Sequence, residues 1–181
     1  MNNQTLSFPQ EYLIKEYFSL SIKQKVTTTT IVMQLLNNEV NTSTIPATVH
    51  LLQMHLPSVL RTTCYNDNDI PFHIEVKQTE IGHLFEHILL EYLCQLKIAK
   101  GFRRATFSGR TRWNWIKDPR GKFHIRVTCG AKDSGIFPLA IKKTIRLMKI
   151  ILQSGEDQQI AQQLLTGASN GIKNGNGTRN Q

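Results

Sequence analysis

Apolar residues recur with helical spacing in several separate parts of the chain. This spacing predicts helices over residues 11–20, 46–57, 80–97 and 137–153, the last ending near Gly155. A short helical turn is predicted at Val59 and Leu60, and a last short helix over 156–165. From Gly167 the sequence reads GASNGIKNGNGTRNQ, which offers too little apolar surface to fold, so a disordered tail is predicted.

Other segments carry the alternating pattern that is typical of strands. Apolar and polar residues alternate over 72–77 and again over 122–128, and β-branched residues predict a strand over 26–36. A short strand is also predicted over 102–107. Strands and helices do not follow a regular βαβ order, which favours an α+β fold, a largely antiparallel sheet with helices packed on one face. We divide the chain into an N-terminal helical segment (1–24), one α+β domain (25–166) and the tail (167–181).

Composition agrees with one globular domain. The chain has 181 residues, of which 40% are hydrophobic and 19% charged, enough for a single core. No run approaches the roughly 20 apolar residues of a membrane span, and the start lacks the layout of a secretory signal, so a cytoplasmic protein without membrane contact is expected. Three well-separated cysteines, without a CxxC pair, predict reduced thiols rather than disulfides. No phosphate loop or dinucleotide fingerprint is present.

The positive charge of the chain is concentrated in one segment. Ten of the 22 basic residues lie between Lys97 and Arg126, with Asp118 as the only acidic residue there, while the rest of the chain carries 12 of each sign. Such a cluster attracts anionic partners, whether nucleic acid, a polyacid or substrate carboxylates. No recognisable nucleic-acid motif accompanies it, which makes nucleic acid the least favoured of these partners.

The most informative motif is the HxxEH pattern formed by His83, Glu86 and His87, the inverted zincin order. On a helix these three side chains share one arc, opposite an arc of apolar residues. Two imidazoles at i and i+4 can bind one zinc ion, and a carboxylate on the same side can act as a general base towards water. The pattern therefore predicts a zinc-dependent hydrolase with Glu86 as the catalytic base.

A catalytic zinc site needs a third protein ligand. Glu91 is one candidate, although it lies about 12 Å from His83 along the helix axis at roughly 1.5 Å per residue. His73, Glu75 and His124, on the polar faces of predicted strands, are the alternatives. Cys94 shares the arc of the two histidines, and packing is the favoured role for its thiol.

A second motif, GRTRWNW, interleaves two arginines with two tryptophans at Arg110, Arg112, Trp113 and Trp115. Guanidinium groups bind carboxylates in a bidentate manner and indole rings stack on flat groups, which predicts substrate contacts. The same residues would also suit phosphates and bases. The tryptophans could instead simply project from one face of a strand or hairpin.

These residues resemble the N-terminal domain of cyanophycin synthetase. The resemblance covers roughly residues 25–153 and rests on two motifs, GHLFEH at 82–87 and GRTR at 109–112. It implies a domain that holds the Asp/Arg polymer cyanophycin and, in some members, cuts it at a metal-dependent site. Carried over by position, His83, Glu86 and His87 would form that site, and Arg110 and Arg112 would lie near the polymer. The given sequence contains neither the ATP-grasp nor the Mur-ligase-like domain of the family's larger members, so we expect a protein other than the synthetase itself.

The chain also departs from this family. The stretch around Cys64, expected to be rich in histidine and glycine, reads RTTCYND, and the acidic end of the later strand is replaced by Thr128, Cys129 and Gly130. The alternatives to a hydrolase are therefore a non-catalytic polymer-binding or regulatory module and, less favoured, a basic nucleic-acid-binding protein. An oligomer and a separate synthetase partner both stay open.

Overall fold

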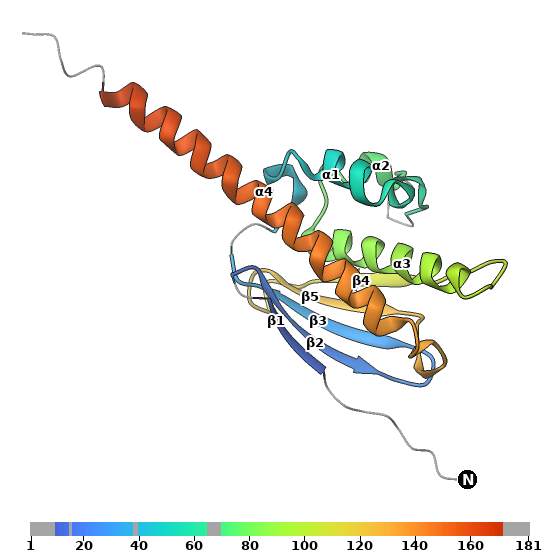
Figure 1. Cartoon of the computed structure of the whole chain (residues 1–181). Helices are drawn as coiled ribbons and strands as arrows, with labels where there is room; N and C mark the ends of the chain where they lie inside the picture. Colours follow the sequence, from blue (N-terminus) through green and yellow to red (C-terminus); the bar gives the residue numbers. More distant parts are fainter. Residues whose placement is uncertain (1–9, 15, 38–39, 65–69, 172–181) are drawn as a thin grey trace, which may run out of the picture.

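The computed structural model describes residues 10–14, 16–37, 40–64 and 70–171, with side chains up to residue 163. Five antiparallel strands form one sheet in the order β1-β2-β3-β5-β4. They comprise β1 (Gln10–Ile14), β2 (Phe18–Gln24), β3 (Thr29–Leu35), β4 (Gly109–Arg112) and β5 (Lys122–Val127). The long helices α3 (Ile81–Ala99) and α4 (Phe137–Gly171) cover one face of this sheet (Figure 1). The α+β prediction is therefore confirmed.

Shorter elements lie beside these layers. They are α1 (Thr48–His55), α2 (Phe72–Glu75) and three 3-10 helices, Thr42–Thr44, Pro57–Arg61 and Ala131–Asp133. Within the part of the chain that the structure describes, no helix combines the length and apolar character needed to cross a membrane.

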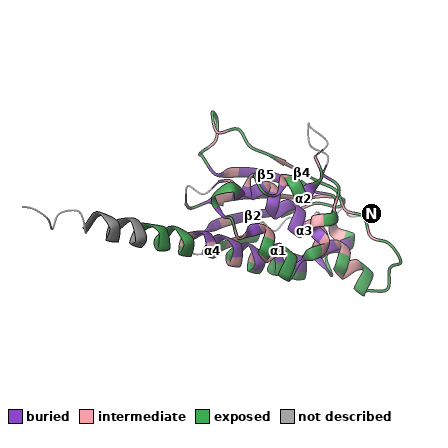
Figure 2. Ribbon diagram, turned by 90° about the horizontal axis from the view of Figure 1, so that it is seen from above, coloured by how far each residue is buried: buried purple, intermediate pink, exposed green. Residues whose placement is uncertain are grey.

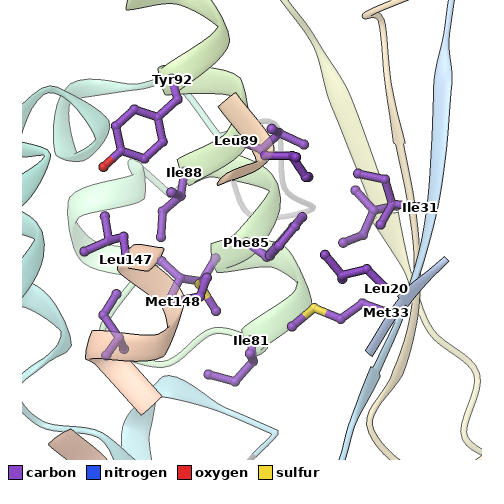
Figure 3. Close-up of a cluster of buried hydrophobic side chains, with 14 of the residues drawn as sticks. Leu20, Ile31, Met33, Ile81, Phe85, Ile88, Leu89, Tyr92, Leu147 and Met148 are labelled. Atoms are coloured by element: carbon purple, nitrogen blue, oxygen red, sulfur yellow. The ribbon is translucent and has the colours of Figure 1, made fainter. Parts of the chain in front are cut away.

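The core lies between the sheet and the two long helices. The inward residues of β2 and β3 alternate along each strand, whereas those of α3 recur at three- and four-residue spacing, so both patterns deliver apolar side chains to the same layer. Figure 3 shows this layer, in which Leu20, Ile31 and Met33 of the sheet face Phe85 of α3. Gly82 of α3 lies so close to the ring of Phe123 that a methyl group there would overlap it. The resulting close packing fixes the position of α3, and hence of its polar side, against the sheet.

Most of the predicted elements are present. The strands predicted over 26–36 and 122–128 correspond to β3 and β5, and the helices predicted over 46–57 and 80–97 correspond to α1 and α3. The predicted turn at Val59 and Leu60 is the 3-10 helix Pro57–Arg61.

The helix predicted over residues 11–20 is wrong. Strands β1 and β2 occupy this region and join the common sheet, so the segment 1–24 is not helical where it is described. Glu16 has a φ of 76°, and the N–H of Tyr17 donates to the carbonyl of Ile14, which together reverse the chain between the strands. The alternating burial along β2, which places Leu20 in the core, overrides the weak helical spacing.

Two predicted strands are also wrong. Residues 72–77 begin with helix α2, in which Phe72 and Val76 are both fully buried four residues apart while Ile74 is half exposed. Six residues are too few to distinguish this helical spacing from alternation. Residues 102–107 are an irregular loop, and the strand follows it as β4.

Helix α4 does not end near Gly155. It continues as one helix to Gly171, so the prediction of a separate helix over 156–165 is wrong. The first five residues of the predicted tail are helical, and residues 172–181 lie outside the described residues. A Cβ on Gly155 would lie 3.0 Å from Ile45, so this glycine marks close packing rather than a helix end. Beyond it, α4 extends past the sheet with exposed side chains at 157–163 (Figures 1 and 2).

A partly buried ion pair lies at the C-terminal end of α3, next to the 101–108 loop. The ammonium of Lys97 lies 2.7 Å from Asp133 and above the rings of Phe102 and Phe107, at 5.1 and 5.3 Å. The side chain of Asp133 is 2% exposed, and its Oδ2 atom has no hydrogen-bond partner in the described structure. Removal of the lysine would therefore leave a buried charge without a counterion.

We expect Lys97→Met to lower the free energy of unfolding by about 3 kcal/mol, because breaking a buried pair leaves its partner desolvated. Urea denaturation measures this loss. The exposed Lys142→Met is the control, and the double variant Lys97→Met with Asp133→Leu should recover most of the stability. A loss no larger than that of the control would contradict the importance of this pair.

Candidate metal centre

Helix α3 brings His83, Glu86 and His87 to one side of the molecule. Glu86 and His87 are buried, and the side chain of His83 is 16% exposed. The two imidazole rings lie 4.8 Å apart between centroids, and the buried ring of Phe72 stacks on His87 at 3.8 Å. The sequence-predicted trio therefore shares one partly enclosed place rather than a solvated helix face.

Cys64 supplies a third donor next to the two histidines. Its Sγ atom lies 3.4 Å from Nε2 of His83, and single donor atoms of Cys64, His83 and His87 all lie within 4.8 Å of one another. Sulfur and nitrogen atoms bound to the same tetrahedral zinc ion would be about 3.5 Å apart, given bond lengths of roughly 2.3 and 2.0 Å. The distance between Cys64 and His83 therefore agrees with a shared metal ion, and His87 lies close enough to join them.

Hydroxyl groups behind the imidazoles orient the rings. Thr62 Oγ1 donates to the carbonyl of Val59, so at 3.1 Å from Nδ1 of His87 it accepts the proton of that nitrogen. Nε2 of His87 then carries the lone pair that a metal ion requires. Nδ1 of His83 lies 2.9 Å from Thr79 Oγ1 and 3.6 Å from a carboxylate oxygen of Glu75. Such outer contacts are typical of histidines that bind metal ions.

The protonation states also suit metal binding. Burial, together with the neighbouring His83, lowers the pKa of His87 to about 3, and burial lowers the pKa of His83. Both rings are therefore neutral near pH 7, the form that coordinates metals. Burial raises the pKa of Glu86 from 4.5 to about 7, opposed by the hydroxyl of Thr111, which donates to Glu86 Oε2. Glu86 can therefore both accept and release a proton near neutral pH.

These side chains line a cleft of about 470 Å³. Cys64, Glu75, Glu80 and residues of α3 form one side of it, and residues 107–113 form the other. Acidic residues lie in one wall, near α2, and the basic residues of β4 belong to the other. The cleft therefore has residues of both signs of charge around it.

The other predicted ligands do not join this cluster. Among the described residues, Cys64, His83 and His87 form the one group of three donors close enough to share an ion. Glu91 accepts from Gln95 instead, His73 is exposed on α2, and His124 contacts Asp118. Glu75 reaches His83 from behind rather than the donor cluster itself. The thiol of Cys94 donates to the carbonyl of Ala105, which agrees with the packing role expected for it.

The predicted substrate contacts divide between the two faces of the sheet. Arg110, Arg112 and Trp113 line the cleft. By register, however, Arg110 opposes Arg126 and Arg112 opposes His124, so their side chains share the sheet face turned away from α3. Trp115 packs against Phe123 and donates to the carbonyl of Lys122, and it does not line the cleft. The substrate contact of Trp115 therefore stays a prediction, and its indole ring packs against the sheet as the alternative interpretation allowed.

The raised pKa of Glu86 predicts a pH-dependent stability of the metal-free protein. The protonated carboxyl stabilises the fold fully below pH 4.5, and this contribution is lost as the pH rises through 7. Glu86→Gln removes the titration, so the variant should gain about 2 kcal/mol relative to the wild type between pH 5 and pH 8. Denaturation in EDTA at both pH values measures the difference. The buried histidines are present in both proteins, so their contributions cancel in the comparison. A stability difference between the two proteins that does not change with pH would contradict the raised pKa of Glu86.

The hydroxyl behind His87 predicts an effect on metal affinity. We expect Thr62→Val to weaken zinc binding by about 10-fold, because outer-shell partners of ligating histidines typically contribute 10- to 100-fold. Competition with a zinc-binding dye measures this affinity. Thr63→Val, one residue along the chain, is the matched control, and equal affinities of the two variants would show that the hydroxyl does not orient the ring.

Comparison with known proteins adds no family to this geometry. No protein-family model matches the chain, and no curated protein matches it significantly. The functional assignment therefore rests on the residues and geometry of the cleft.

Proposed function

We propose that this protein is a zinc-dependent amide hydrolase that acts on an Asp/Arg-rich polymer such as cyanophycin. One observation carries the proposal: Cys64, His83 and His87 present three metal donors within 4.8 Å of one another in a cleft that also contains Glu86. The three donors found among the described residues match the number of protein ligands in catalytic zinc sites.

The side chains have distinct roles in this proposal. A zinc ion held by Cys64, His83 and His87 would supply Lewis-acid polarisation of a scissile carbonyl and would activate water. Glu86 removes the proton from the attacking water and returns it to the leaving amine, for which a pKa of about 7 is well placed. Thr111 donates to Glu86 Oε2 and so holds the carboxylate in one orientation. Thr62 and Thr79 keep the imidazoles aligned.

Charge supports the substrate class. Glu75 and Glu80 belong to one wall of the cleft, and Arg110 and Arg112 belong to β4 in the other wall, with their side chains on the sheet face turned away from α3. A polymer that carries both carboxylates and guanidinium groups can complement both sets of charges when it lies along β4, whereas a polymer of a single sign would be repelled by one set. The resemblance to the cyanophycin synthetase N-terminal domain points to the same class of polymer.

The test is to incubate zinc-loaded protein with purified cyanophycin and to follow new amino termini and chain length. The proposal expects shortening that stops in EDTA and resumes when zinc is added back. Cosedimentation with the polymer without any shortening would instead support a non-catalytic binding module. Cleavage that continues unchanged in EDTA, or absence of both binding and cleavage, would overturn the proposal.

A further inference from the structure

Strand β4 is an open edge of the sheet and also a wall of the cleft. In the part of the chain that the structure describes, it pairs with β5 alone, and its residues line the cleft together with Cys64 and Glu75. An edge strand presents backbone N–H and C=O groups that can pair with another chain. The position of these groups decides what the cleft can hold.

The hydrogen bond from the N–H of Thr128 to the carbonyl of Ser108 shows which groups point outward. Bonded and non-bonded pairs alternate along an antiparallel ladder, so Arg110 and Arg112 bond to β5 while Gly109 and Thr111 direct their backbone groups away from it. Within residues 10–14, 16–37, 40–64 and 70–171, no group outside the ladder bonds to the backbone of Gly109 or Thr111. Two donor and acceptor pairs, about 7 Å apart, therefore stand at the cleft.

These two residues are also the ones that contact the proposed base. The hydroxyl of Thr111 donates to Glu86, and a Cβ on Gly109 would lie 2.5 Å from Glu86 Oε1. Glycine at 109 thus allows the carboxylate to lie directly against the edge strand. A chain that pairs with β4 would pass beside Glu86.

We infer that the cleft binds its substrate as an extended polypeptide that adds to β4 as a further strand. This inference rests on the proposed hydrolase function and names the form in which the substrate is held. Backbone hydrogen bonds to Gly109 and Thr111 supply affinity that does not depend on sequence, as in other cases of strand addition. They also fix the peptide bonds of the bound chain beside His83, Glu86 and His87.

The charges on the two sides of β4 define the side chains of the bound strand. Successive side chains of a strand point to opposite faces. Those on one face meet Arg110 and Arg112, and those on the other meet the wall that contains Glu75 and Glu80. The preferred ligand is therefore an extended chain in which acidic and basic side chains alternate.

Amide hydrogen exchange tests this inference. Glu86→Gln prevents cleavage, and the probe is a short α-peptide of alternating Asp and Arg. Saturating peptide should slow exchange of the Gly109 and Thr111 amides by at least about tenfold, and the amides of Arg110 and Arg112, already bonded to β5, should change less. A peptide of the same composition with all Asp before all Arg is the matched control, and we expect it to bind at least tenfold more weakly.

Several results would overturn the inference. One is binding of the alternating peptide that leaves the amides of Gly109 and Thr111 unprotected. Another is an affinity for the block peptide, or for a peptide methylated on every backbone nitrogen, that equals the affinity for the alternating peptide. A third is the absence of binding at millimolar peptide. Arg110→Gln with Arg112→Gln should weaken binding, whereas Arg146→Gln on α4 should not. Zinc content and cyanophycin cleavage by the wild type are measured separately. Strand addition can therefore be disproved while the hydrolase function is retained, and the hydrolase function can be disproved while strand addition is retained.

Discussion

Replacing Cys64 by alanine is expected to lower the affinity for zinc about a hundredfold or more. Protein zinc sites of four ligands bind with roughly 10–16 kcal/mol, so each ligand contributes about 3 kcal/mol, which corresponds to a factor of the order of 10². Cys64 Sγ lies 3.4 Å from Nε2 of His83, as expected of two atoms that share one zinc ion. Competition with a chromophoric chelator measures the change.

Cys94→Ala provides the matched control for this variant. Its thiol lies on α3 and donates to the carbonyl of Ala105, outside the donor cluster. The control should bind zinc like the wild type. If both cysteine variants keep wild-type affinity, Cys64 is not a ligand.

Glu86→Gln is expected to reduce the rate of polymer cleavage by about 10³-fold while zinc binding stays within a few-fold of the wild type. General bases contribute roughly 10²- to 10⁴-fold, and an amide cannot accept the proton. Glutamine has the size of glutamate and still accepts a hydrogen bond from Thr111, so the packing against β4 is retained. Initial rates with zinc-saturated protein and a zinc titration give the two quantities.

Glu91→Gln is the matched control for the base. Glu91 lies on the same helix, accepts from Gln95 and stands outside the donor cluster. It should retain wild-type cleavage. Equal losses from the two variants, or undiminished cleavage by Glu86→Gln, would remove Glu86 from the catalytic role.

The fold could be predicted wherever a long segment carries one clear period. The helix over 80–97 and the strand over 122–128 are of this kind, because their burial patterns extend over several repeats. The errors fall where tertiary contacts decide between short alternatives. Phe72 belongs to a helix because Val76, one turn later, is buried with it, and Phe18 belongs to a strand because β3 lies beside it.

The candidate site could be predicted only in part. The spacing of His83, Glu86 and His87 on one helix is a local property, so the sequence contains it completely. Cys64 approaches from a different element, 19 residues away, and three thiols in the chain offer no local feature that separates it from the other two. The need for a third ligand pointed to an additional donor, but only the packing of the Pro57–Arg61 helix against α3 selects it.

The most direct test of the metal centre is X-ray absorption at the zinc edge of the zinc-loaded protein. We expect one sulfur at about 2.3 Å and two imidazole nitrogens at about 2.0 Å, with the remaining position filled by a light atom. The sulfur contribution should disappear in Cys64→Ala and persist in Cys94→Ala. Zinc surrounded by oxygen atoms alone, or a protein that binds no zinc, would show that Cys64, His83 and His87 do not form a zinc centre.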